Sequence, residues 1–162
     1  MFFVKRAHRH YNRSVNNITT KSAEETKSVA KLFAEMLAQE MTAKGALVVA
    51  LDGALGAGKT TFAQGFAEGL GVKEKVKSPT FVLVHTHTLK KKARFKAFYH
   101  ADCYRLESEK DVNAIGLDEA MNNPENIVLV EWARRIKKTL PNDTIRVTFK
   151  YINERTRKIS FN

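Results

Sequence analysis

The residues with the clearest chemical purpose run from Gly53 to Thr60 and read Gly-Ala-Leu-Gly-Ala-Gly-Lys-Thr. They fit the phosphate-binding pattern G-x-x-x-x-G-K-[ST] at every position. Glycines let backbone N–H groups turn inward around an anion, and a following helix presents its positive end to the same anion. The residues that we expect to hold the phosphates of a nucleotide are Gly56, Ala57, Gly58, Lys59, Thr60 and Thr61.

Charged and metal-binding side chains extend this pattern. Lys59 would neutralise the β- and γ-phosphates, and Thr60 would offer its hydroxyl to Mg²⁺. P-loop enzymes also need a carboxylate at the end of a second buried strand, and Glu131 directly follows the apolar run 127–130. Asp102 ends another β-rich run, where it could position the attacking water or the metal's water shell. Lys59, Asp102 and Glu131 are therefore the candidate catalytic residues.

Further candidates have weaker support from the pattern. Thr80 begins an extended segment after Pro79, where a switch loop could sense the γ-phosphate. Trp132 could stack on a base or cover the site, although packing is the simpler interpretation. His100 and Cys103 are more typical of buried core residues than of chemistry.

The elements that must position these residues follow from the hydrophobic pattern. The apolar run 46–51 predicts a buried strand, and 60–70 places its apolar residues on one face of a helix. Ser22 and Glu25 match a capping box, which predicts an amphipathic helix over 23–41. Further strands are predicted over 80–88 and 95–101, which form a hairpin with a basic tip, and over 127–130, 144–151 and 158–161. Strand, glycine loop and helix thus follow one another in the order that a P-loop requires.

Size and composition bound the class of protein. With 162 residues, 43% of them hydrophobic and 28% charged, the chain fits one folded domain. Residues 1–20 hold four Lys and Arg and no acid, so we expect a poorly ordered basic tail before a single domain over 21–162. There is no apolar run of membrane-spanning length, and one cysteine cannot form an intramolecular disulfide; we expect a cytoplasmic protein. The net charge of +11 favours polyanionic partners without naming one.

Five segments together closely resemble one family. In chain order they are GALGAGKTT, SPTFVLV, HADCYRL, AIGLDEA and IVLVEWARR, and the chain resembles the TsaE (YjeE) family from about residue 22 to 161. These are ATPases of bacterial tRNA threonylcarbamoyladenosine synthesis. The resemblance implies an α/β domain of the P-loop NTPase type, with three layers and a central mixed β-sheet, that binds ATP and Mg²⁺ and hydrolyses ATP slowly when alone. It also implies the partners TsaD and TsaB, whose complex transfers the threonylcarbamoyl group to the adenosine next to the anticodon.

The same resemblance assigns roles to individual residues. Thr60 and Glu131 would be Mg²⁺ ligands, while Asp102 and Thr80 would belong to the catalytic and switch regions. The residues that would contact the nucleotide are Gly56, Ala57, Gly58, Lys59, Thr60, Thr61, Thr80, Trp132 and, by counting from distant motifs, Ala23 and Arg155.

Some positions depart from the family pattern. Ala54 stands where the family usually has an acid, and Ala133 where a proline usually follows the tryptophan. Loss of the acid could alter the mouth of the site, but the phosphate nest is made by the backbone. The loop 90–96 and the N-terminal tail are unusually basic, which leaves room for direct contact with tRNA.

Two alternatives remain open from the residues alone. A small-molecule or nucleotide kinase shares the strand, P-loop and helix, and Arg134 and Arg135 could serve the lid that it needs. A basic RNA-binding module with a vestigial P-loop is the other. A GTPase is less favoured, because the sequence contains no N-K-x-D run for base recognition.

Overall fold

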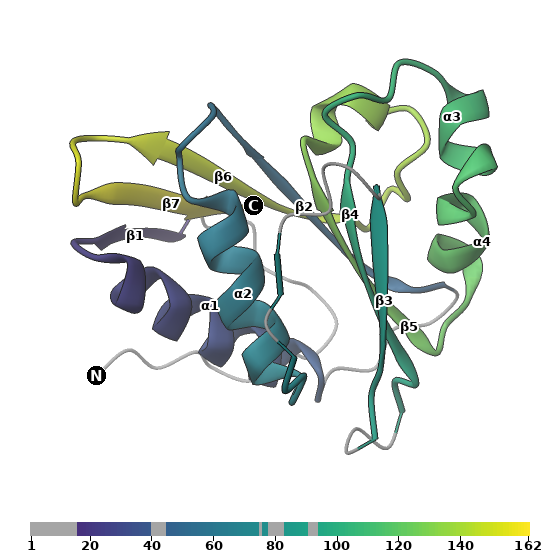
Figure 1. The fold of residues 1–162 in the computed structure, drawn as a ribbon, viewed down its shortest axis with the longest axis horizontal. Coiled ribbons are helices and arrows are strands. Elements are labelled where there is room, and N and C mark those ends of the chain that lie inside the picture. The colour runs from purple at the N-terminus through teal and green to yellow at the C-terminus, as the bar shows by residue number, and fades with distance from the viewer. Residues whose placement is uncertain (1–15, 40–44, 75, 78–82, 91–93) are drawn as a thin grey trace.

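One seven-stranded mixed sheet organises the molecule, in the order β1-β7-β6-β2-β5-β4-β3 (Figure 1). The computed structural model describes residues 16–39, 45–74, 76–77, 83–90 and 94–162. The strands are β1 (Asn16–Thr20), β2 (Leu47–Gly53), β3 (Val84–Thr88), β4 (Ala97–Asp102), β5 (Asn126–Glu131), β6 (Ile145–Tyr151) and β7 (Arg157–Phe161). The helices are α1 (Ala23–Leu37), α2 (Lys59–Gly69), α3 (Glu109–Ala114), α4 (Leu117–Asn122) and the 3₁₀ turn η1 (Ala133–Ile136).

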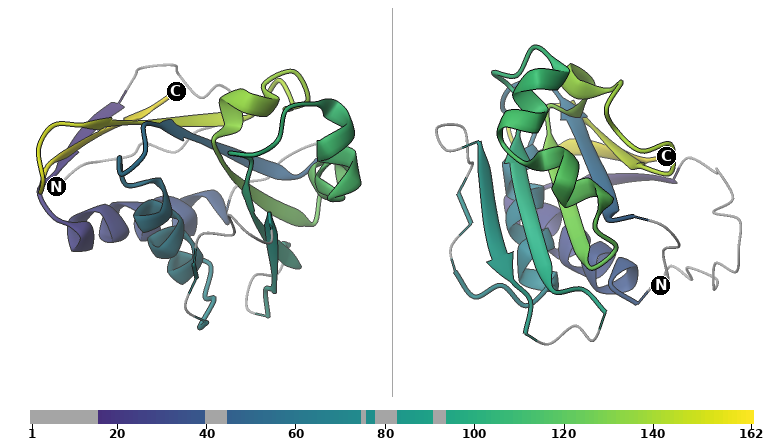
Figure 2. Two further views of the ribbon diagram at one scale, coloured as in Figure 1. Left: turned by 45° about the horizontal axis from the view of Figure 1, so that its top comes forward. Right: turned by 90° about the vertical axis from the view of Figure 1, so that its right-hand side faces the viewer.

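The parallel centre of the sheet is buried on both faces. Strand β2 pairs in parallel with both β5 and β6, and β5 pairs in parallel with β4. Val49 and Leu51 face a core that includes α1 and α2, whereas Val48 and Ala50 face a second core that includes α3, α4 and η1. Figure 2 shows these two helical layers on opposite sides of the sheet. The predicted three-layer α/β fold of the P-loop NTPase type with a central mixed sheet is confirmed.

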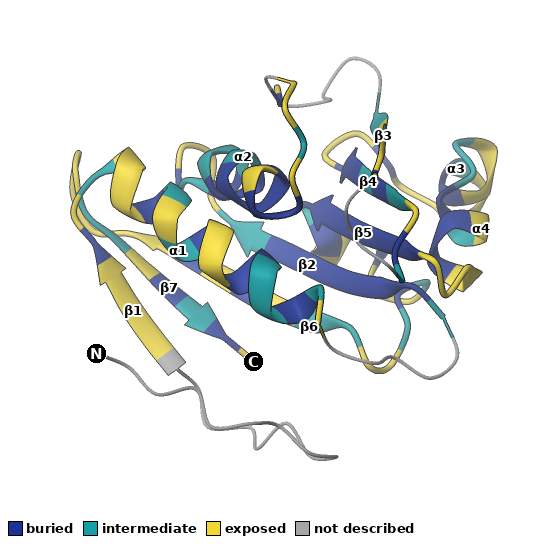
Figure 3. Cartoon of the chain, turned by 90° about the horizontal axis from the view of Figure 1, so that it is seen from below, coloured by how far each residue is buried: buried dark blue, intermediate teal, exposed yellow. Residues whose placement is uncertain are grey.

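Helices α1 and α2 pack unusually closely. A Cβ atom added at Gly65 would overlap the carbonyl oxygen of Lys27, and one added at Gly69 would overlap that of Lys31. These two glycines on α2 therefore let the helix backbones approach where any side chain would hold them apart. The contact covers the apolar stripe of α1, whose inward face is dark blue in Figure 3.

The N-terminal region differs from its prediction. Residues 16–20, expected to be the end of a tail, form strand β1, which pairs antiparallel with β7; residues 1–15 lie outside the described part of the chain. Pairing with a strand more than a hundred residues away leaves no local pattern in a segment of five residues.

Helix α1 begins at the predicted residue, with Ser22 accepting the N–H of Glu25, but ends at Leu37 rather than at residue 41.

The connection between β4 and β5 contains two helices that the sequence pattern did not predict. Each of α3 and α4 has six residues, too few for a hydrophobic period to stand out. Helix α3 nevertheless carries a capping box, formed by Ser108 and Asp111.

The predicted hairpin of β3 and β4 is confirmed, although residues 91–93 of its basic tip lie outside the described residues. None of the helices in the described part of the chain is long and apolar enough to span a membrane.

Candidate nucleotide site

The glycine loop joins the end of β2 to the start of α2, as predicted. Gly56 has φ = +73° and Gly58 has φ = +103°, a region that side chains disfavour, so glycine is needed at both turns. Gly58 is also the N-cap of α2 and offers no side-chain acceptor to the first turn. The N–H groups at this end of the helix therefore remain available to an anion.

Lys59 lies inside this loop rather than in solvent. Its Nζ donates to the carbonyl oxygens of Gly53 (2.8 Å) and Ala54 (2.9 Å) and lies 3.9 Å from the centroid of the Trp132 ring. Burial lowers the pKa of Lys59, an effect opposed by the negative charge of Glu131 and other nearby carboxylates. The ammonium group is thus desolvated and held in place by contacts that a phosphate could replace.

A chain of hydrogen bonds links the loop to the end of β5. The hydroxyl of Thr60 donates to Oε2 of Glu131 (3.0 Å), and Oε1 of Glu131 lies 2.8 Å from Nε2 of His100. Glu131 is 2% exposed and His100 fully buried. Both carboxylate oxygens are therefore fixed, and the Thr60 hydroxyl, having donated its hydrogen, keeps its lone pairs for a cation.

Asp102 lies beside this carboxylate. Parallel pairing of β4 and β5 sets Asp102 opposite Glu131, so both acids stand at the same edge of the sheet as the glycine loop. Asp102 is 3% exposed, and its Oδ1 accepts the N–H of Tyr104 (2.9 Å).

Cys103 turns into the core, where burial and the Asp102 charge raise its pKa to about 12. Its thiol is thus a core group, as the sequence suggested.

Two cavities flank the glycine loop. The first, of about 340 Å³, is lined by Leu55, Gly56, Gly58, Lys59, Thr60, Thr61, Asp102, Tyr104, Glu131 and Trp132. The second, of about 470 Å³, is lined by Lys21, Ser22, Ala23, Glu24, Thr26, Gly56, Gly58, Thr61, Glu154, Arg155 and Arg157. Both include Gly56, Gly58 and Thr61, so the loop forms a shared wall. The first cavity holds the acids and Lys59, whereas the second collects the residues near the two termini.

Most of the predicted site residues thus come together. Ala57 is fully buried within the loop, and Ala23 and Arg155, far apart in sequence, line the same cavity. Thr80 lies outside the described residues. The structure shows where the two residues that depart from the family pattern lie. The carbonyl oxygen of Ala54 accepts a hydrogen bond from Lys59, and Ala133 is buried at the start of η1.

Arg157 lines the candidate site although no sequence pattern predicts it. From β7 its Nη2 donates to the carbonyl oxygen of Gly56 (3.2 Å), and its guanidinium lies 4.6 Å from the Tyr151 ring centroid. Its Cγ would be 3.7 Å from a Cβ atom placed at Gly58. No pattern near Arg157 indicates this role, because the contact joins residues 101 positions apart.

The sequence profile described as "Threonylcarbamoyl adenosine biosynthesis protein TsaE" matches residues 20–159, which is most of the chain. The chain belongs to the TsaE family. The matched region contains every residue that lines the two cavities, so both cavities lie within the domain that the family shares.

Relatives from several bacteria support this membership. The chain is 40% identical over 142 residues to the tRNA threonylcarbamoyladenosine biosynthesis protein TsaE of Bacillus subtilis, covering 88% of this chain and 82% of that one. It is 37% identical to the TsaE protein of Haemophilus influenzae, covering 76% and 75% of the two chains. The crystal structure of Bacillus subtilis YdiB is similar in fold, with a TM-score of 0.63 and 34% identity, over 91% of this TsaE chain and 85% of YdiB.

Proposed function

We propose that this protein binds ATP with Mg²⁺, hydrolyses it to ADP and phosphate, and acts on a TsaD–TsaB complex in the cytoplasm during tRNA threonylcarbamoyladenosine synthesis. The observation that carries the proposal is the hydrogen bond between Thr60 and Glu131. It joins the phosphate loop to a buried strand-end carboxylate, the pair that P-loop enzymes use around their metal. A role in tRNA modification is supported by the names of the relatives.

The oxygen atoms at this point fit Mg²⁺. A hydroxyl and a carboxylate lie side by side, and hard oxygen donors are what Mg²⁺ prefers. Within the described residues there is no cluster of three or more His, Cys, Asp or Glu side chains that could hold a metal. Thr60 and Glu131 would hold Mg²⁺, and when bound it would neutralise charge on the β- and γ-phosphates.

The remaining residues take roles according to their position. Lys59 would exchange its carbonyl partners for phosphate oxygens, and Asp102, beside Glu131, would orient the attacking water and accept its proton. Ala23 and Arg155 would contact the nucleoside in the second cavity, across the loop from the acids. Trp132 would cover the phosphate side, where its ring already packs on the Lys59 ammonium.

Nucleotide binding is tested by thermal unfolding with and without Mg-ATP. Ligand that binds only the native state raises the unfolding temperature, so ATP should protect the unsubstituted protein. Lys59→Ala should remove that protection, while Lys150→Ala, a change of an exposed lysine on β6, should keep it. If ATP does not protect the unsubstituted protein, the loop is vestigial and the proposal fails.

Hydrolysis is tested by phosphate release, alone and with purified TsaD and TsaB. We expect the Glu131→Gln and Asp102→Asn variants to bind ATP but to lose most of the turnover, since each new side chain has the shape of the original one but lacks its negative charge. Glu119→Gln, on α4, is the matched control. Unchanged turnover in both site variants would remove the assigned roles, and ATP consumption that requires a small-molecule acceptor would favour a kinase.

A further inference from the structure

Four exposed cations closely follow Trp132, a residue that lines the first cavity. Within η1 and the residues after it, Ala133 and Ile136 face the core, as the three-residue period of a 3₁₀ turn requires. The two positions between them and the two positions after Ile136 are exposed: Arg134, Arg135, Lys137 and Lys138. We call these four residues, with the rings of Tyr104 and Trp132, the basic rim.

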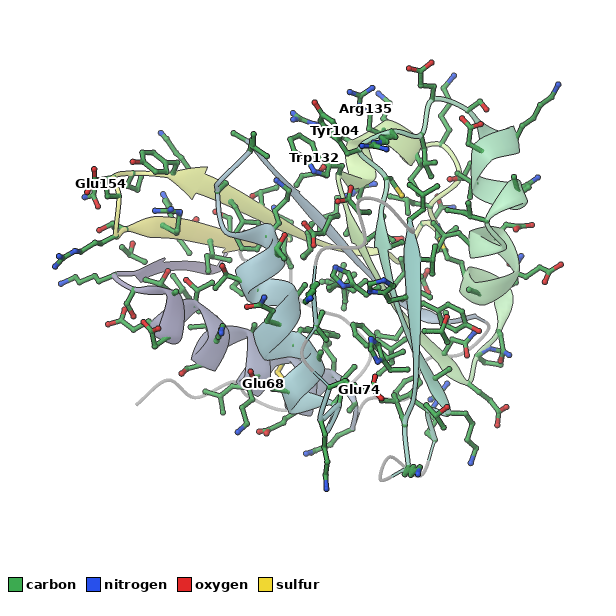
Figure 4. All side chains as sticks on the ribbon, viewed as in Figure 1. Glu68, Glu74, Tyr104, Trp132, Arg135 and Glu154 are labelled. Carbon is green, nitrogen blue, oxygen red and sulfur yellow. The ribbon has the colours of Figure 1, made fainter. Side chains whose placement is uncertain are left out.

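Two aromatic rings that line the cavity contact the two arginines. The guanidinium carbon of Arg134 lies 5.4 Å from the centroid of a Trp132 ring, and that of Arg135 lies 5.6 Å from the Tyr104 ring centroid. Tyr104 and Trp132 are themselves 5.0 Å apart between centroids, and both line the cavity. Figure 4 shows Tyr104, Trp132 and Arg135 gathered at one end of the molecule. The two arginines of the rim thus adjoin the proposed nucleotide site through rings that line its cavity.

The cations of the rim have no ion-pair partner within the described part of the chain. Among the residues that the structure describes, no carboxylate forms an ion pair with Arg134, Arg135, Lys137 or Lys138. The nearby Asp52 accepts the backbone N–H of Arg134 (3.0 Å), which fixes the start of η1. Four neighbouring positive charges that no described carboxylate pairs with attract a polyanion, and phosphate groups release bound counterions when such a surface binds them.

The rings indicate which polyanion. Tyr104 is 47% exposed and presents a flat surface next to the guanidinium of Arg135. Exposed aromatic rings among cations are typical of surfaces that bind unpaired nucleotides, since bases stack on the rings while phosphates contact the charges. An acidic protein surface would use the charges but would not need a solvent-facing ring.

We propose that the basic rim binds an unpaired segment of substrate tRNA next to the nucleotide site. The proposal rests on the proposed role in tRNA modification, and it names the surface that would meet the RNA. It places the contact on η1, the two lysines that follow it and the neighbouring rings, rather than on the basic loop 90–96.

The test is the affinity for an unmodified tRNA transcript and for its isolated anticodon stem-loop, measured without nucleotide over a range of salt concentrations. Lys137→Gln/Lys138→Gln should raise the Kd roughly tenfold at 0.1 M salt and reduce the salt slope by about two. The matched control is Lys31→Gln/Lys73→Gln, which removes two exposed lysines from the α1 and α2 side of the sheet. Tyr104→Leu should weaken RNA binding, and Tyr104→Phe should retain it.

Three results would overturn the proposal. Equal loss in the rim and control variants would mean that only overall charge matters, and unchanged RNA binding in the rim variant would exclude the rim. Loss of TsaD–TsaB binding with RNA affinity intact would make the rim a protein-docking surface. Protection by ATP, measured on the same samples, reports separately on the proposed function and should persist in the Lys137→Gln/Lys138→Gln variant.

Discussion

At the scale of single residues, His100 decides how Glu131 is presented. His100 is fully buried, and its Nδ1 has no hydrogen-bond partner among the described residues, so Nε2 is the atom that contacts the carboxylate. A hydrogen bond to a charged group contributes about 1.5–3 kcal/mol, and its loss would leave a buried carboxylate underpaired. His100 is thus a positioning residue behind Thr60 and Glu131.

We expect His100→Leu to lower turnover and to raise the Mg²⁺ concentration needed for half-maximal ATP hydrolysis, because Glu131 loses its fixed orientation. His100→Gln can place an N–H near the former Nε2 and should recover much of both. Phosphate release at varied Mg²⁺ measures the effect, with thermal unfolding alongside to separate it from loss of the fold. A folded Leu variant with wild-type Mg²⁺ dependence would contradict this role.

At the scale of elements, the crossing of α1 and α2 sets the direction in which the glycine loop enters α2, because α2 begins at Lys59. The crossing depends on Gly65, where a Cβ atom would overlap the Lys27 carbonyl oxygen. An alanine in a helix interior usually stabilises by about 1 kcal/mol relative to glycine. Here the close backbone contact should reverse that sign.

Gly65→Ala is therefore expected to lower the free energy of unfolding by about 1–3 kcal/mol, the usual cost of overpacking. Denaturant unfolding measures it. Glu68→Ala, on the exposed side of α2 (Figure 4), is the control and should change stability by less than about 0.5 kcal/mol. A Gly65→Ala variant as stable as the parent would mean that the helices can separate at little cost.

At the scale of the whole molecule, β1 closes one side of the sheet. It pairs with β7, whose Ile159 and Phe161 belong to the core beneath α1, and the Thr20 hydroxyl lies 2.8 Å from that of Thr26. Without β1, strand β7 would become an exposed edge with unpaired backbone groups.

A chain that starts at residue 21 should consequently unfold at a temperature lower by about 5 °C or more than one that starts at residue 16, given roughly 2–4 °C per kcal/mol for a domain of this size. Thermal unfolding of the two truncated chains without nucleotide makes the comparison. Equal unfolding temperatures would show that β1 adds no stability. The two chains differ only in the strand, since both keep Ser22 as the cap of α1.

Most of the candidate site could be predicted from the sequence because the glycine loop is a local structure. Its glycines, lysine and threonine lie within eight residues, between a strand and a helix whose hydrophobic periods are plain. Glu131 and Asp102 were found for a related reason, since each ends an apolar run. The ends of parallel strands meet at one edge of a sheet, so their proximity follows from topology. Family resemblance added Ala23 and Arg155, which local pattern could not supply.

The sequence by itself thus determined the fold class, the position of the glycine loop and the family, because these depend on short-range spacing and on hydrophobic period. Only the tertiary structure decided that His100 supports Glu131, that Arg157 reaches Gly56, and that β1 pairs with β7. These contacts join residues 31 and 101 positions apart in the first two cases. Their geometry is fixed by how the sheet orders its strands, and no segment of the chain encodes that order locally.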